Sequence, residues 1–153
     1  MKWESSLSAD ANAQLILPRL AADYFKAGRK AAGKNSPKAL HRFRISTKRF
    51  RYALELFEPV YGPSLKKRLK VLHKLQDALG KISDYKSIIE LVNGDQSTAA
   101  NLEKAMKRKT KEFRKEWKSF DSRGQLQDWK DYLANSANGK RPTKAPAPPH
   151  SSK

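Results

Sequence analysis

The chain has 153 residues, enough for one domain with a modest core, and its 33 Lys and Arg against 15 Asp and Glu give a net charge of +18. This excess of positive charge repels itself in the folded state, and it attracts polyanions such as nucleic acid, anionic lipid or phosphate chains. The absence of cysteine excludes disulfides, thiol nucleophiles and thiolate metal sites.

The beginning of the sequence lacks a secretory pattern, because the apolar run at 15–17 is stopped at once by Pro18 and Arg19. No stretch approaches the roughly 20 apolar residues that a helix needs to cross a bilayer. We therefore expect a cytoplasmic protein that is not inserted in a membrane.

The first two helices are predicted from periodicity and from their end signals. The first runs from about residue 12 to residue 32, with Pro18 in its first turn or at a kink, and ends at Gly33. Its expected buried stripe is Ile16, Leu20, Tyr24 and Ala27. The second opens at Ser36-Pro37, a cap followed by proline, and stops before Pro59.

The remaining helices are predicted after the turn at 61–63. A third helix covers about 64–92 and is expected to bend near Gly80, and a fourth covers about 98–120. A short fifth helix follows Gly124, and the Pro- and Lys-rich tail at 138–153 should be disordered. Four helices of about 20 residues are each roughly 30 Å long, which favours an all-α, antiparallel four-helix bundle over residues 1–137.

Basic residues recur at helical spacing beside the apolar stripe of each long helix. They are Arg19 and Lys26 on the first helix, His41, Arg44, Lys48 and Arg51 on the second, Lys70, Lys74 and Lys81 on the third, and Lys104, Lys107, Lys111, Arg114 and Lys118 on the fourth. Such faces are often simply solvated, with the aliphatic stems covering apolar surface. Like charges along the fourth helix cost on the order of 1–2 kcal/mol, however, which favours a site for a polyanion. Composition alone leaves both interpretations open.

Metal binding and catalysis have little support in the sequence. His41 has no metal-binding residue one helical turn away, since positions 37, 38, 44 and 45 are Pro, Lys, Arg and Ile. No glycine-rich phosphate loop occurs. The acidic residues Asp77 and Asp84 are explained by salt bridges to Lys74 or Arg44. We therefore predict no catalytic residue, no metal site and no cofactor.

Nucleic acid is the main alternative ligand. Proteins that bind single strands interleave basic residues with aromatic rings on which bases stack. Here mainly Tyr52 lies near the basic arc, and other aromatic residues belong to the apolar stripes: Phe43, Phe50, Phe57, Phe113 and Trp117. A surface that contacts phosphates but offers no platform for bases suits a ligand made only of phosphates.

Two segments of the chain resemble the signature of the CHAD family, the conserved histidine α-helical domain. In "LHRFRISTKRFRYALELF" at 40–57 the family's His and basic positions are filled by His41, Arg44, Lys48, Arg49 and Arg51. In "KLQDALGKISDYKSIIELV" at 74–92 the motif is met by Leu75, Gln76, Asp77, Leu79, Gly80 and Asp84. The resemblance covers about residues 12–120 in helix order, and its diagnostic part is 40–92.

The resemblance implies helical bundles whose basic residues line a groove or pore, and non-catalytic binding of inorganic polyphosphate. The basic residues of the first segment would face the ligand, with Lys70, Lys74 and Lys81 as helpers. It also implies, as alternatives or additions, an accessory role beside CYTH-type triphosphate enzymes and association with polyphosphate granules. The family domain usually has two bundles and this chain has one, so either a homodimer rebuilds the pair or a single bundle binds more weakly. We favour the homodimer.

Overall fold

The computed structural model describes residues 2–34, 36–92 and 94–137, and this part of the chain is helical with no β-strand. Its elements are α1 (Ala9–Ala32), α2 (Pro37–Leu56), α3 (Glu58–Tyr61), α4 (Ser64–Leu91), α5 (Gln96–Phe120) and α6 (Gln125–Asn135). The all-α prediction is confirmed. The predicted disordered tail at 138–153 lies outside the described residues.

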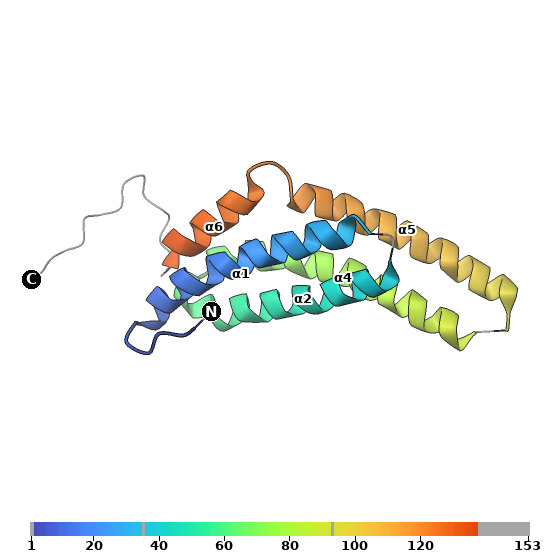
Figure 1. The fold of residues 1–153 in the computed structure, drawn as a ribbon, viewed down its shortest axis with the longest axis horizontal. Helices are drawn as coiled ribbons and strands as arrows, with labels where there is room; N and C mark the ends of the chain where they lie inside the picture. The colour runs from blue at the N-terminus through green and yellow to red at the C-terminus, as the bar shows by residue number, and fades with distance from the viewer. Residues whose placement is uncertain (1, 35, 93, 138–153) are drawn as a thin grey trace, which may run out of the picture.

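The long helices alternate in direction, and the fourth rod of the bundle is shared by two helices. α1 packs on α2 and on α6, while α4 packs on α2 and on α5 (Figure 1). α5 and α6 run the same way, separated by an elbow at 121–124 in which Gly124 adopts a φ of 85°, a conformation that glycine reaches without a steric penalty. The predicted antiparallel four-helix bundle with a short C-terminal helix is therefore confirmed.

Side-chain caps set where three of the long helices begin. Ser8 and Ser36 accept hydrogen bonds from the backbone N–H groups at positions 11 and 39, at 3.1 and 3.3 Å. Asp95 caps α5 through the Thr98 N–H and hydroxyl, and these hydrogen bonds hold the pKa of the Asp95 carboxyl below its ordinary value. Because Ser8 is the cap of α1, the helix begins at Ala9, and Pro18 lies well inside it instead of in its first turn.

An aromatic cluster fills the middle of the bundle. The Tyr24 ring of α1 stacks on Phe43 and Phe50 of α2 with centroids 5.0 and 4.8 Å apart. Its buried hydroxyl is 2.8 Å from Thr47 Oγ1. α1 and α5 approach closely at Gly28, where an added Cβ would lie 2.1 Å from the Trp117 ring. The buried stripe of α1 is thus shifted from the predicted one: Ile16, Leu20 and Ala27 lie at its half-buried edge, and Leu17, Ala21 and Phe25 are fully buried.

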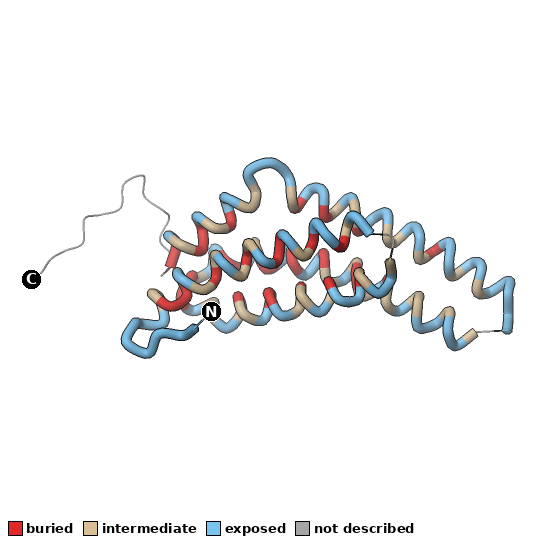
Figure 2. Tube along the Cα trace, in the orientation of Figure 1, coloured by how far each residue is buried: buried red, intermediate tan, exposed pale blue. Residues whose placement is uncertain are grey.

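The hairpin of α4 and α5 extends beyond the place where α2 begins (Figure 1). Buried positions concentrate where α1, α2 and α6 lie against α4 and α5, whereas most of the far end of the hairpin is exposed or half-buried (Figure 2). Ile88 and Leu91, near the end of α4, are 41% and 83% exposed. The start of α2 therefore lies at the border between the packed bundle and the protruding end of the α4–α5 hairpin.

Candidate anion-binding surfaces

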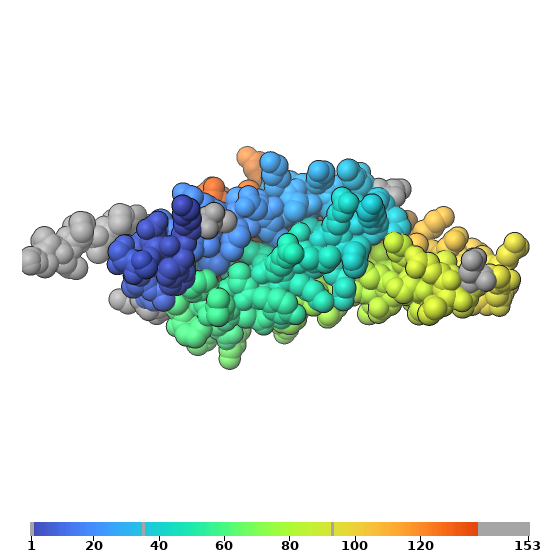
Figure 3. Space-filling model, turned by 60° about the horizontal axis from the view of Figure 1, so that its bottom comes forward, coloured from blue at the N-terminus to red at the C-terminus, as the bar shows by residue number. Residues whose placement is uncertain are grey.

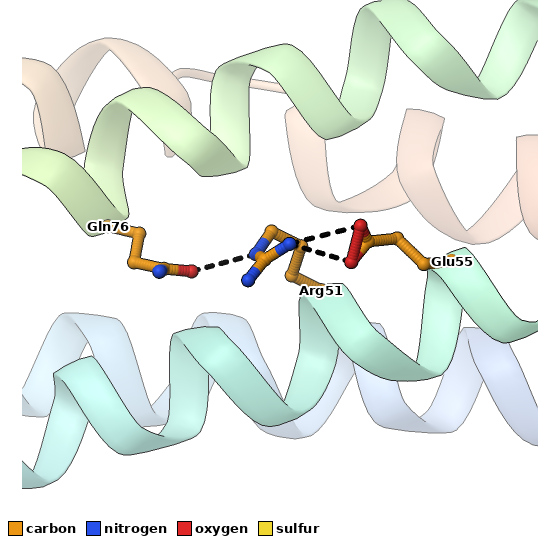
Figure 4. A network of polar contacts seen from close by, with 3 residues as sticks. All are labelled: Arg51, Glu55 and Gln76. Atoms are coloured by element: carbon orange, nitrogen blue, oxygen red, sulfur yellow. Dashed lines mark hydrogen bonds and ion pairs between the residues drawn. The ribbon is translucent and has the colours of Figure 1, made fainter.

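Arg51, one member of the basic stripe on α2, is held inside the fold. It is buried, and its Nη1 donates to both carboxylate oxygens of Glu55, at 2.6 and 3.0 Å. Its Nε donates to Gln76 Oε1 of α4 at 2.8 Å (Figure 4). Arg51 therefore joins α2 to α4, and its guanidinium is not displayed to a ligand as the sequence led us to expect. The spacing of Glu55, four residues after Arg51, was the signal in the sequence for this pairing.

Arg44, two turns earlier on α2, has the opposite surroundings. It is half-buried, forms no ion pair within the described ranges, and its buried Nε has no hydrogen-bond partner there. A Cβ placed on Gly80 of α4 would lie 3.7 Å from this Nε, so the side chain crosses α4 where α4 has no side chain. Leaving such a donor unsatisfied costs about 1–3 kcal/mol, which an anionic ligand could offset.

His41 and Lys48 share the face of α2 that carries Arg44. At 100° per residue, the three positions fall within an arc of about 60°. His41 is exposed and Lys48 half-buried, and neither belongs to an ion pair among residues 2–34, 36–92 and 94–137. The surface of α2 forms a band between those of α1 and α4 (Figure 3). We call His41, Arg44 and Lys48 the α2 cationic face.

Other predicted ligands lie on different sides of the molecule. Arg49 points toward α1, where it lines a small hollow together with Leu20 and Asp23. Arg19 and Lys26 are exposed on α1. The structure therefore does not bring these three cations together with the α2 cationic face.

The lysines of α4 face α5 or solvent. Lys74 and Lys81 line a groove of about 430 Å³ between α4 and α5, whose walls also carry Asp77, Glu112 and Glu116. Lys74 Nζ lies 3.2 Å from Glu116 Oε1. Neither Asp77 nor Asp84 forms an ion pair in the part of the chain that the structure describes, so the expected bridges to Lys74 or Arg44 are wrong. Lys74 forms an ion pair with Glu116 of α5 instead. Lys70 is exposed.

The basic ridge of α5 lies beside the start of α2. Lys107, Lys111 and Arg114 line a cavity of about 580 Å³ with the first turn of α2, and we call these three residues the α5 cluster. Arg114 Nη2 donates to the Lys34 carbonyl at 3.4 Å. Lys104 and Lys118 are exposed on the same ridge and do not line this cavity. Within one chain the predicted set is thus divided among several surfaces, of which the α5 cluster borders the first turn of α2.

A model of the CHAD domain matches residues 3–93, which is more than half of the chain. The chain belongs to the CHAD family. No curated protein and no solved structure gives a match. The CHAD family is linked with polyphosphate binding, and its domain is generally a binding domain without catalytic activity.

The CHAD match covers α1 to α4 and stops at the turn before α5. The match is therefore shorter at its C-terminal end than the predicted resemblance, which continued to about residue 120. Within it, two residues of the second CHAD motif contact arginines of the first: Gln76 accepts from Arg51, and Gly80 lies under Arg44. The motif pair thus has a structural basis at the α2–α4 contact.

The described residues contain no group of three or more His, Asp or Glu placed to hold a metal ion. Among the same residues, no helix has the length and apolar character that a membrane span requires.

Proposed function

We propose that this CHAD protein binds inorganic polyphosphate on the α2 cationic face without acting on it chemically. The observation that carries the proposal is Arg44, whose charge is unpaired and whose Nε–H lacks an acceptor within the described residues. Phosphate oxygens accept several hydrogen bonds from one guanidinium, which makes arginine suited to this ligand. His41 and Lys48 supply further donors on the same side of α2.

The interior bonds of Arg51 give this surface a rigid base. Since Arg51 binds Glu55 on its own helix and Gln76 on α4, it fixes the two helices against each other beside Arg44. We propose that Arg51 is a positioning residue, while Arg44, Lys48 and His41 contact the ligand. Lys70, exposed on α4, is a candidate for contacts at the edge.

A ligand composed only of phosphates suits this face better than nucleic acid does. The large aromatic rings of α1, α2 and α5 are packed against one another in the core. Tyr52 is exposed beside the cationic face, with the Arg51 guanidinium 4.5 Å from its ring centroid. One ring on this face does not make the series of stacking platforms that single-strand binders use.

The first test replaces two cations and keeps the internal Arg51 pair. Arg44→Ala with Lys48→Ala should lower polyphosphate affinity at least tenfold, while the helical circular dichroism stays unchanged. Arg19→Ala with Lys26→Ala removes the same charge from exposed positions on α1 and should cost less than threefold. Equal losses in the two variants would show that only net charge matters, and would overturn the assignment of the site.

The second test separates the two ligand classes. Polyphosphate should compete with single-stranded and duplex DNA at equal phosphate concentration and fixed salt, because the salt concentration strongly affects both affinities. We expect polyphosphate to displace DNA. Preferential binding of DNA would favour the alternative that this is a nucleic-acid-binding helical protein.

We also propose a homodimer, consistent with the single bundle of this chain. Ile45, Tyr52 and Leu56 are 37%, 54% and 75% exposed, and they follow one another at helical spacing along α2. A second copy would cover this apolar stripe. Light scattering after size exclusion should give twice the monomer mass, and a monomer mass both with and without polyphosphate would contradict the dimer.

An accessory role beside a CYTH-type enzyme would use the same bound polyphosphate. Association with polyphosphate granules would use it too.

A further inference from the structure

The cavity at the start of α2 is a second strongly cationic surface. Of its ten lining residues, four are cations and none is acidic: Lys107, Arg108, Lys111 and Arg114 accompany Ser36, Pro37, Leu40, Ile82, Met106 and Thr110. The groove between α4 and α5 differs, because its cations are mixed with the carboxylates Asp77, Glu112 and Glu116. Among the described residues, the lining of the cavity at the start of α2 therefore carries cations without any carboxylate beside them.

The cavity exists because the helices end at different levels. Leu40 of α2 and Ile82 of α4 both line it, and α4 continues from Ile82 to Leu91, a further nine residues or about 13 Å. α2 begins at Pro37 and therefore does not cover that length of α4. Leu40, Ile82 and Met106 give the cavity an apolar floor under a cationic rim, and low-dielectric walls of this kind concentrate the electric field on an entering anion.

More cations surround the connection between α1 and α2. Lys30, Lys34 and Arg42 line a hollow of about 180 Å³ on the α1–α2 side of this connection, again with no acidic residue in the lining. Arg114 of the α5 cluster donates to the Lys34 carbonyl. The start of α2, whose helix dipole also favours anions, is thus surrounded by positive charge from three helices.

The α2 cationic face leads directly onto this cavity. Pro37, which lines the cavity, falls within the same arc of about 60° as His41, Arg44 and Lys48. The distance along α2 from Lys48 to Pro37 is about 16 Å, and the α5 cluster extends over about 10 Å of its own helix. A flexible anion lying along α2 would therefore meet the α5 cluster after passing the first turn.

We propose that one polyphosphate chain occupies the α2 cationic face and the α5 cluster together, so that the protein selects long chains over short ones. This inference rests on the proposed function. Once one stretch of a long chain is bound on α2, the α5 cluster binds the next stretch as an intramolecular event, at high effective concentration. Tripolyphosphate is too short to reach both surfaces and gains nothing from the second. The α5 cluster lies outside the residues that the CHAD model matches.

The test compares tripolyphosphate with chains of several tens of phosphates, at fixed salt, for three proteins. The first is the unchanged chain. The second carries Lys107→Ala and Lys111→Ala, which remove two exposed members of the α5 cluster. The third carries Lys104→Ala and Lys118→Ala, which remove the same charge from the same helix but from positions outside the cavity. Alanine is compatible with helix in every case.

The α5-cluster variant should lose at least tenfold in affinity for long chains and less than twofold for tripolyphosphate. Its salt dependence for long chains should also weaken, by roughly one in the slope of log affinity against log salt for each lost phosphate contact. The Lys104/Lys118 variant should lose less than threefold for either ligand. Equal losses in both variants, or unchanged affinity for long chains in the α5-cluster variant, would overturn the inference and leave the α2 site standing. No binding of either ligand by the unchanged chain would overturn the proposed function, and this inference with it.

Discussion

Two glycines lie inside the long helices, and the regions around them differ. Gly28 of α1 faces the aromatic cluster, where an added Cβ would be 2.1 Å from the Trp117 ring. Gly80 of α4 faces Arg44, and an added Cβ would stand at an ordinary contact distance of 3.7 Å from Arg44 Nε. A glycine in the interior of a helix costs roughly 0.5–1 kcal/mol relative to alanine. At Gly28 the close packing of α1 and α5 excludes a side chain, which explains why glycine is there despite this cost. At Gly80 packing does not require glycine.

The difference separates a region that determines stability from one that is available for binding. Around Gly28 the rings of Tyr24, Phe25 and Trp117 are in contact and leave no room. Around Gly80 a charged group is left without a partner in the described part of the chain.

The largest effect is expected for Gly28→Ala. Because the new methyl group would overlap the rigid indole of Trp117, we expect a loss of about 3 kcal/mol in the free energy of unfolding, at the upper end for overpacked cores. Urea unfolding measures this loss. Gly33→Ala, just after the same helix, provides the control, since its Cβ would have 3.4 Å to the nearest atom. Trp117→Leu should partly restore the stability of Gly28→Ala; no restoration would show that the overlap is not the cause.

Arg51→Ala should have the next largest effect on stability. It removes the bonds to Glu55 and Gln76 and leaves a carboxylate that is 36% exposed without its partner. Because Glu55 retains some solvent, we expect a loss of about 2 kcal/mol, less than for a fully buried pair. Arg44→Ala should cost under about 1 kcal/mol, since it breaks no ion pair. Denaturant midpoints distinguish the two variants, and similar losses would contradict the division of roles along α2.

Alkaline pH should weaken the aromatic region specifically. Burial raises the pKa of Tyr24 well above its ordinary value near 10, and burial likewise raises the pKa of Tyr61. The folded state therefore holds these protons more tightly than the unfolded chain does. The resulting stability is fully present below pH 10 and is lost above it, at about 1.4 kcal/mol per pH unit for each tyrosine.

Tyr24→Phe isolates this effect from the ionisation of the many lysines. At pH 9 it should cost about 1 kcal/mol or less, because Thr47 Oγ1 keeps its bond to the Phe43 carbonyl at 2.9 Å. Above pH 10 the stabilities of the two proteins should converge. Curves that stay parallel up to pH 11 would show that the Tyr24 hydroxyl is not protected by the fold.

Gly80→Ala should have the smallest effect on stability, and in the opposite direction. The helix propensity of alanine should raise the free energy of unfolding by up to about 1 kcal/mol. The methyl group also fills the space beside Arg44 Nε, so polyphosphate affinity should fall several-fold. Thermal unfolding and titration measured on the same samples check both results. A protein that is more stable and binds equally well would show that the space over Gly80 has no role in binding.

The sequence was sufficient to predict the long helices and α6, but it did not predict the short α3 or most contacts between helices. Ser36-Pro37 and Gly124 are local signals, and the structure begins α2 and α6 beside them. The stripe of α1 was misplaced because spacing sets which residues share a face but not which face the neighbouring helices cover, and here the covered face is centred on Leu17, Ala21 and Phe25. Asn12 is in fact buried, and its side chain binds the Glu4 backbone at 2.8 Å.

Only those parts of the candidate site that lie on a single helix could be predicted from the sequence. Spacing places residues around one axis, so the arc of His41, Arg44 and Lys48 follows from the sequence. Spacing does not say which neighbour a face meets, and therefore Lys74 was grouped with Arg44 although it faces Glu116 on α5. Arg44 Nε lacks a hydrogen-bond partner because of how its side chain lies against Gly80 of α4. No pattern within α2 contains that information.

The helices on the two sides of the elbow, α5 and α6, limit how far this protein can be truncated from its C-terminal side. Phe113, Trp117, Phe120 and Trp129 all come after the end of the CHAD match, yet they complete the ring stack that begins with Tyr24. A fragment trimmed to the matched segment would open this stack to water and lose one wall of the bundle. The segment that the CHAD model matches and the segment that completes the core therefore end at different residues.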